Sequence, residues 1–309
     1  MAEHAMYFTD ERAQRNYKIR VGILKGLVYV FLSIFALFMV IPFVIMVVGS
    51  FIEAKAFEGF ADTAKISYLG FSNWSFSNYQ FIFSNGSSSF PTYFLNTLIV
   101  AVASTTVTVV TAVLAAFAFA RLNFKGRDAL FALLLATMMI PGEMMVITNY
   151  QTVKAINWTN TFAALILVHG VSVFYIFYLR QTFQQIPNEL YLAAKVDGVG
   201  DLGYLVKVMI PIAMPTITTI IILSMMGAWN SYIWPNLVAR GGWKYFPKHS
   251  MKLVSNGLRD MFSLTIANQP IPDTYKIAGS MVISIPLLIV FILFRKYIMR
   301  GVSRSGIKG

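Results

Sequence analysis

The chain has 309 residues, of which 57% are hydrophobic and only 12% are charged, and its mean hydropathy is +0.65. Soluble proteins carry about 25% charged residues, so this composition is that of a membrane protein. Cysteine is absent and the three histidines lack metal-ligand spacing, which excludes disulfides and thiol nucleophiles and predicts no metal site. The net charge of +12 is attributed to basic cytoplasmic loops, and we expect no nucleic-acid partner.

Six apolar runs have the length that a helix needs to cross a hydrocarbon core of about 30 Å. They occupy residues 26–52, 90–120, 129–150, 162–179, 208–235 and 277–294. The first run starts too late and is too long for a cleaved signal peptide. The sequence therefore predicts an all-α integral membrane protein with six transmembrane helices, in which residues 26–309 form one transmembrane domain.

The distribution of basic residues predicts the orientation of these helices. Sixteen of the 25 lysines and arginines fall in four segments that lie on one side of the membrane: residues 1–25, 121–128, 180–207 and 295–309. Lysine and arginine concentrate in cytoplasmic loops, so both termini are predicted to be cytoplasmic. Residues 1–25 then form an N-terminal cytoplasmic segment and residues 295–309 a cytoplasmic tail.

Two outer segments are too long to be simple turns. Residues 53–89 combine aromatic side chains with a Ser/Gly cluster, and residues 236–275 form an extracytoplasmic loop of roughly forty residues. Their aromatic content argues against simple disorder, so we expect them to be functional.

A glycine pattern stands out in the predicted cytoplasmic segment ELYLAAKVDGVGDLG, residues 189–203. Gly198, Gly200 and Gly203 have the G-x-G-x-x-G spacing of a dinucleotide-binding turn. However, no strand precedes them, and there is no room for a βαβ unit. We therefore reject a nucleotide loop here.

The same stretch favours a helix, a tight turn and a second helix. Asp197-Gly198 is a turn dipeptide, and glycine accepts the left-handed conformation that ends a helix. Leu190, Tyr191 and Ala194 share one face of the first helix by their spacing. The stretch is thus a compact loop that projects into the cytoplasm or, alternatively, an amphipathic loop on the membrane surface.

The run ELYLAAKVDG, followed by IPIAMP, resembles the signature loop of permease subunits of binding-protein-dependent ABC importers, E-A-A-x-x-x-G and then I-x-L-P. Ala193, Ala194 and Gly198 fill the A-A and G positions, and Ile210-Pro211 is a shortened later element. Leu192 departs from the pattern, because the family usually has Glu there.

Four further stretches resemble the sugar branch of this family, and within it the permease that pairs with a second, different permease in maltose-type importers. They are AAFAFARLNFKGR at 115–127, MMIP at 138–141, WNSYIWP at 229–235 and the tail RKYIMRGVSRSGIKG at 295–309. The resemblance implies the type I ABC importer permease fold.

The resemblance also implies roles for two cytoplasmic segments. A coupling loop, about residues 181–207, is implied to dock into a cleft on a cytoplasmic ATPase through Glu189, Ala193, Ala194, Asp197 and Gly198. The tail is implied to reach the ATPase dimer interface through Gly301, Ser305, Gly306 and Lys308; a basic anchor on anionic lipid is the alternative. ATP and Mg²⁺ would then bind the ATPase partner, and this chain would bind no cofactor.

Two further groups of residues are candidates for contacts with substrate. Trp243, Tyr245 and Phe246 in the extracytoplasmic loop suit either the sugar of a binding protein or the membrane interface. Asn230, with Trp229 and Tyr232, is a candidate gate in the translocation path; the other polar residues in predicted spans are Glu143, Asn149, Gln151 and His169. In maltose-type importers the membrane sugar site belongs to the partner permease.

The resemblance thus predicts the permease subunit of an ATP-driven importer that moves an oligosaccharide across the bacterial cytoplasmic membrane. Its expected partners are a second homologous permease, two cytoplasmic ATPase subunits, an extracytoplasmic sugar-binding protein and membrane lipid. The alternative is an ion-coupled secondary transporter, although neither inverted repeats nor a buried charge pair is evident. An intramembrane enzyme would need a catalytic cluster, and none is visible.

Overall fold

The computed structural model describes residues 11–53, 74–85, 90–263, 265–266 and 269–303, and these are predominantly helical. The longer helices are α1 (Glu11–Phe51), α4 (Phe90–Arg121), α5 (Arg127–Thr137), α6 (Gly142–Ala155), α8 (Val173–Gln184), α9 (Asn188–Val196), α11 (Ile210–Trp229), α13 (Val254–Phe262) and α14 (Asp273–Ser303). The short helices are α3 (Ser77–Gln80), α7 (Phe162–Ile166), α10 (Asp201–Tyr204), α12 (Ile233–Val238) and the π-helices η4 (Phe81–Asn85) and η5 (Leu205–Met209).

Two small antiparallel hairpins complete the described elements. One pairs β1 (Gly242–Trp243) with β2 (Phe246–Ser250), and the other pairs β3 (Thr265–Ile266) with β4 (Gln269–Pro270). Both lie within the predicted extracytoplasmic loop of residues 236–275. That loop is therefore largely structured, because it also contains α13 and the second half of α12.

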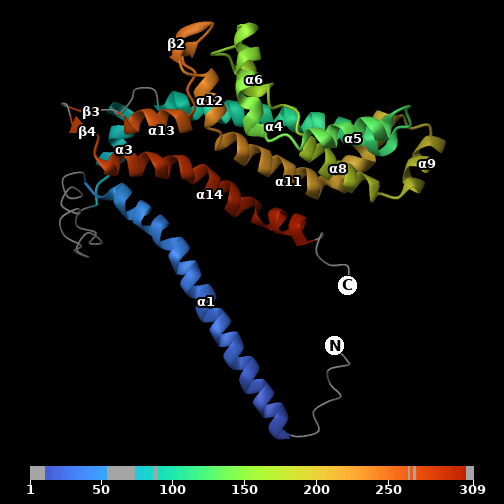
Figure 1. Cartoon of the computed structure of the whole chain (residues 1–309), viewed down its shortest axis with the longest axis horizontal. Helices are drawn as coiled ribbons and strands as arrows, with labels where there is room; N and C mark the ends of the chain where they lie inside the picture. The colour runs from blue at the N-terminus through green and yellow to red at the C-terminus, as the bar shows by residue number, and fades with distance from the viewer. Residues whose placement is uncertain (1–10, 54–73, 86–89, 264, 267–268, 304–309) are drawn as a thin grey trace.

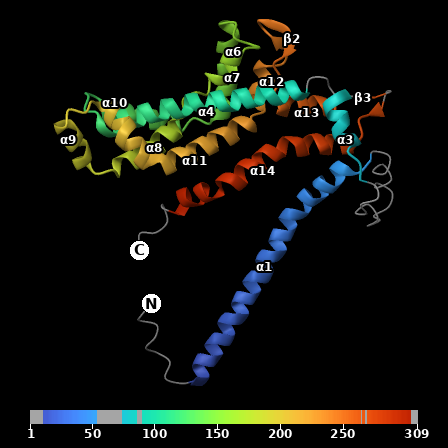
Figure 2. The same ribbon diagram turned by 180° about the vertical axis from the view of Figure 1, so that it is seen from behind.

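Helix α4 is the centre of the bundle. Helices α8 and α11 pack along it, and α14 packs on α11 (Figures 1 and 2). Three buried apolar clusters follow α4 from one end to the other: one around Phe90 and Tyr93, a second around Val100, and a third around Val113 and Phe117. The core is thus a column of clusters along one membrane-length helix.

Helix α1 leaves this bundle. It contacts α14, yet it diverges from the bundle along most of its length (Figure 1). Its most apolar stretch has a mean hydropathy of 2.9, and none of that stretch is buried against the described residues. At ~1.5 Å per residue, its 41 residues extend about 60 Å, which exceeds the hydrocarbon thickness. The described residues leave this apolar stretch of α1 uncovered, so it is available to lipid or to another subunit.

The structure confirms an all-α membrane fold but changes the form of two predicted spans. Four helical runs can cross a membrane uninterrupted: Gln14–Phe51, Phe90–Arg121, Asp201–Trp229 and Asp273–Arg295. The predicted third span, 129–150, divides into α5 and α6, which are bent by 96°. Pro141 explains the break, because a proline disfavours helical backbone in the residue before it and cannot donate a backbone hydrogen bond.

The predicted fourth span, 162–179, is also discontinuous. It divides into α7 and α8, which are separated by residues 167–172, and Ser172 caps the start of α8 by accepting a hydrogen bond from the Tyr175 amide. The connection lies close to α4: a Cβ at Gly170 would stand 2.7 Å from a methyl carbon of Val107. Thr111 donates a hydrogen bond of 2.7 Å to the Gly170 carbonyl. Side chains of α4 thus satisfy a backbone that no longer forms helix, as a membrane interior requires.

Candidate functional site

The predicted cytoplasmic loop is a helix, a turn and a second helix, as expected. Helix α9 starts after Pro187 and α10 starts after Gly200. Tyr191 and Ala194 pack against the cluster around Phe117, whereas Leu190 remains exposed. The predicted apolar face therefore exists, but without Leu190.

Gly198 ends α9 in the left-handed conformation, with φ of +75°. The Val199 amide donates to the Ala194 carbonyl at 2.8 Å, and the Gly198 amide donates to the Lys195 carbonyl at 3.1 Å. This pair of hydrogen bonds is the Schellman motif, which satisfies helix-terminal carbonyls and fixes the exit direction of the chain. The turn is thus set by one residue type, because other residues adopt this conformation only at a cost.

Asp201 joins α9 to α10. Its carboxylate accepts a hydrogen bond of 2.6 Å from the Tyr191 hydroxyl and lies 2.7 Å from the Lys195 ammonium. The Tyr191 ring also packs edge-on against the Tyr204 ring, with centroids 5.1 Å apart. Sequence reasoning missed this clamp, although the i, i+4 spacing of Tyr191 and Lys195 places both on one side of α9.

The clamp also fixes the protonation states of the loop at neutral pH. The hydrogen bond with Asp201 raises the pKa of Lys195, because the carboxylate stabilises the charged ammonium. The same carboxylate raises the pKa of Tyr191, because ionising the phenol would break its hydrogen bond and place two negative charges together. Neither shift brings titration closer to neutral pH, so the clamp is insensitive to physiological pH changes.

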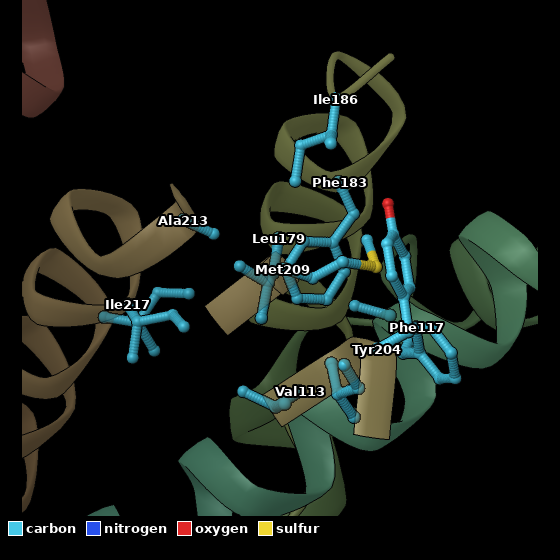
Figure 3. Close-up of a cluster of buried hydrophobic side chains, with 12 residues drawn as sticks. Val113, Phe117, Leu179, Phe183, Ile186, Tyr204, Met209, Ala213 and Ile217 are labelled. Atoms are coloured by element: carbon cyan, nitrogen blue, oxygen red, sulfur yellow. The ribbon is translucent and has the colours of Figure 1, made fainter. Parts of the chain in front are cut away.

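The base of the loop is attached to the bundle through an apolar cluster and one arginine. Tyr204 and Met209 lie against Phe117 of α4 and Phe183 of α8 (Figure 3). Arg121, the last residue of α4, donates hydrogen bonds to the carbonyl of Phe183 in the last turn of α8 and to that of Ile186 just beyond it. The base of the loop is therefore attached to α4, α8 and α11 together. Sequence reasoning also missed Arg121.

The outer side of α9 is exposed and partly apolar. Leu192 and Val196 are 56% and 89% exposed, and their spacing of four residues puts them on one side of the helix. Glu189 and Ala193 are exposed as well. We call Leu192 and Val196 the α9 patch. Large exposed apolar side chains on a projecting element are typical of protein interfaces.

We expect replacement of Asp201 by asparagine to loosen α9. The ion pair with Lys195 is lost, and the hydrogen bond from Tyr191 loses its charged acceptor. Amide hydrogen exchange across residues 188–204 is expected to accelerate by about two- to fivefold. Asp197→Asn is the matched control, because Asp197 makes no ion pair within the described part of the chain. Equal exchange in both variants would contradict the clamp.

The aromatic residues predicted to meet a sugar lie on the β1–β2 hairpin. Trp243 is partly buried, packing against Phe162 and Phe246 with centroids 5.5 and 4.8 Å away. Tyr245 and Phe246 are 67% and 56% exposed. Trp243 thus supports the hairpin, and Tyr245 and Phe246 are the residues available to a partner.

The predicted gate residues lie at the junction of α11 and α12. Trp229 is buried, and its indole nitrogen donates to the Ile283 carbonyl of α14 at 3.1 Å. Asn230 is exposed at the end of α11, and the Tyr232 hydroxyl contacts the guanidinium of Arg259. Trp229 therefore joins two helices, whereas Asn230 remains open to the surroundings.

The other predicted residues are dispersed. Gly301 lies in the last turn of α14, and Ser305, Gly306 and Lys308 lie outside the described residues. Glu143 and Gln151 are exposed on α6, Asn149 is partly buried there, and His169 lies in the connection between α7 and α8. Within the described ranges, no group of three His, Asp or Glu side chains could hold a metal ion.

Comparison with known proteins places this arrangement in a family. The profile described as "Binding-protein-dependent transport system inner membrane component" matches residues 108–305, which include the clamped loop. The arabinooligosaccharides transport system permease protein AraQ of Bacillus subtilis is 29% identical over 241 residues, covering 76% of this chain and 79% of AraQ. The polygalacturonan/rhamnogalacturonan transport system permease protein YtcP of the same organism is 30% identical over 287 residues, covering 92% and 97%.

A solved structure shares the fold. It is a chain of a bacterial ABC transporter involved in the import of the acidic polysaccharide alginate, and it aligns with a TM-score of 0.74 at 22% identity, covering 94% of this chain and 99% of that one. Permeases of this family are transport subunits, and a separate subunit hydrolyses ATP. The chain belongs to the family of binding-protein-dependent transport system inner membrane components, the permeases of ABC importers.

Proposed function

We propose that this permease carries an oligosaccharide across the cytoplasmic membrane, and that the loop formed by α9 and α10 couples transport to ATP hydrolysis on its partner. The observation that carries the proposal is the clamped loop. It is rigid because of Asp201 and the Gly198 turn, it ends in the exposed α9 patch, and it is fastened to three helices by Arg121 and the cluster around Phe117. Such an element turns closure of a docked ATPase into movement of whole spans.

We infer the orientation and the assembly from three further features of the chain. The loop lies in a predicted inner segment, so both termini are assigned to the cytoplasm. Two ATPase subunits then bind ATP and Mg²⁺, and one of them receives the α9 patch. The exposed apolar surface of α1 supports the presence of a second, homologous permease, because a neighbouring subunit would pack against that surface. The exposed Tyr245 and Phe246 face the binding protein on the opposite side.

The oligosaccharide assignment draws on the named substrates of the relatives, and it can be tested directly. The tagged chain is purified in mild detergent from its native host and its companions are identified by mass spectrometry. We expect a second permease and an ATPase to accompany it, and hydrolysis to rise when an oligosaccharide-loaded binding protein is added. Hydrolysis that responds to a binding protein loaded with an amino acid, and to none loaded with sugar, would overturn the substrate assignment.

A further inference from the structure

A cavity of about 260 Å³, open on one side to the surroundings, lies where four elements of the bundle meet. It is lined by the central part of α4, the connection between α7 and α8, the end of α11, and α12. Seven lining residues carry a hydroxyl or imidazole group: Ser104, Thr108, His169, Ser172, Tyr175, Ser224 and Ser231. This volume is enough to hold several water molecules. The cavity is thus large enough for a small polar group and is not a simple packing defect.

Most of these polar groups have no hydrogen-bond partner among the residues that the structure describes. Within the described residues, no hydrogen bond is made by the His169 imidazole, the Tyr175 hydroxyl, or the side-chain hydroxyls of Ser224 and Ser231. Ser104 donates to a carbonyl of its own helix and can still accept. The His169 side chain is exposed, and Tyr175, Ser224 and Ser231 are half-buried. Their polar atoms are therefore available to water or to a polar ligand in the cavity.

The cavity also has an aromatic wall. The indole nitrogen of Trp234 donates to the Ala164 carbonyl at 2.9 Å, which fixes the ring, and the His169 ring packs edge-on against it with centroids 5.2 Å apart. Aromatic rings beside several hydroxyl groups suit a sugar, whose C–H faces pack on rings while its hydroxyls exchange hydrogen bonds.

The depth of the cavity agrees with a place on a transport path. Ser104 and Thr108 lie midway along α4, and Thr108 donates to the His169 carbonyl at 3.5 Å, at the break between α7 and α8. Non-helical backbone at membrane depth is tolerated only where it is buried in protein or lines an aqueous cavity. Broken helices at mid-depth are also where transporters bind their substrates.

The lining distinguishes between neutral and acidic sugars. It contains no lysine, arginine, aspartate or glutamate, and its only residues with titratable side chains are His169 and Tyr175. A uronic acid would bring a carboxylate into this cavity without a cation to pair with it, which is costly. A neutral sugar loses no charge hydration and meets hydroxyl and imidazole partners.

We propose that this cavity binds one neutral sugar unit of the transported oligosaccharide, so that this permease itself contacts the substrate within the membrane. The proposal rests on the proposed function, because it requires that a sugar be transported. It assigns Tyr175, Ser224 and Ser231 as hydrogen-bonding residues, and Trp234 and His169 as the surface against which the sugar ring packs. It also excludes uronic acid oligomers as the preferred substrate of this importer.

The test uses the complete importer in proteoliposomes, with maltotriose and arabinotriose as neutral probes and trigalacturonate as the acidic probe. The variants are Tyr175→Phe and Ser224→Ala; the controls are Tyr178→Phe on the same helix and Thr106→Ala on the exposed face of α4. Each cavity variant is expected to lower uptake of the neutral sugar by about two- to tenfold, the worth of one hydrogen bond. ATPase stimulation by the loaded binding protein should stay unchanged, whereas a misfolded variant would lose both.

A second measurement uses the absence of cysteine from the chain. In a Ser231→Cys variant, a small maleimide should label this subunit, and the transported neutral sugar should slow labelling while trigalacturonate should not. Suppose that wild type takes up the neutral sugar, that the cavity variants take it up equally well, and that the sugar does not slow maleimide labelling. These results would overturn the cavity site and leave the proposed function standing. Transport of trigalacturonate in preference to both neutral sugars would overturn the neutral assignment. If wild type moves none of the three sugars, the proposed function fails and the cavity site fails with it.

Discussion

A Gly198→Val variant is expected to remain in the membrane and to take up at least about tenfold less sugar. Valine disfavours the left-handed backbone conformation that the turn after α9 requires. Gly198 has φ of +75°, and a non-glycine residue pays about 1–2 kcal/mol for that conformation, with a further penalty for a branched Cβ. No atom lies within 4 Å of a Cβ built at this position, so the expected effect comes from the backbone and not from a clash.

Two matched variants isolate that cause. Gly200 also has open space around its Cβ, but its φ of −69° and ψ of 163° are ordinary extended values, so Gly200→Val should transport normally. Asparagine tolerates the left-handed conformation better than other residues, so Gly198→Asn should recover most of the uptake. The measurement is uptake per ATP hydrolysed in proteoliposomes. Normal coupling in Gly198→Val would remove the turn from the mechanism.

The loop shows which parts of such a site a sequence can predict. The helix, the turn and the second helix are all predictable, because Pro187 marks a start and the Asp197-Gly198 dipeptide marks an end by local chemistry. The clamp by Asp201 is not, since an exposed aspartate in a first turn is equally consistent with a favourable helix-dipole contact. Arg121 is 65 residues from its acceptor Ile186, and no local pattern connects them.

The spans show a similar division. Hydropathy identifies apolar segments correctly, yet it does not register whether the backbone within them is continuous. The signals for the two breaks were present in Pro141 and Gly170, but prolines also occur inside α1, α11 and α14, which remain helical. The neighbours decide the outcome: Thr111 of α4 supplies the hydrogen bond that the opened backbone at Gly170 needs. The cavity depends on that break, so it could not be predicted from sequence.

A charge placed on the α9 patch is expected to remove the ATPase from the importer. Val196 is 89% exposed and Leu192 lies one turn before it, so Val196→Asp should leave α9 folded while any partner would have to desolvate a carboxylate. A carboxylate buried without a partner in an interface costs at least about 2 kcal/mol, so affinity for the ATPase is expected to fall by about thirtyfold or more. The loss of affinity is measured as the amount of ATPase that co-purifies with the tagged permease, before and after a wash with salt.

Three control variants show whether the ATPase is lost because docking fails, because a charge has been added, or because coupling is impaired. Gln185→Asp adds the same charge at an exposed position on the end of α8, outside the patch, and should retain the ATPase. Val196→Ala removes apolar area without adding charge and should lie between wild type and Val196→Asp. Gly198→Val should keep the ATPase bound yet uncoupled, because it changes the direction of the loop and leaves the patch intact. If Val196→Asp retains its ATPase as well as Gln185→Asp does, the α9 patch is not the docking surface, and the exposed end of α10 becomes the next surface to test.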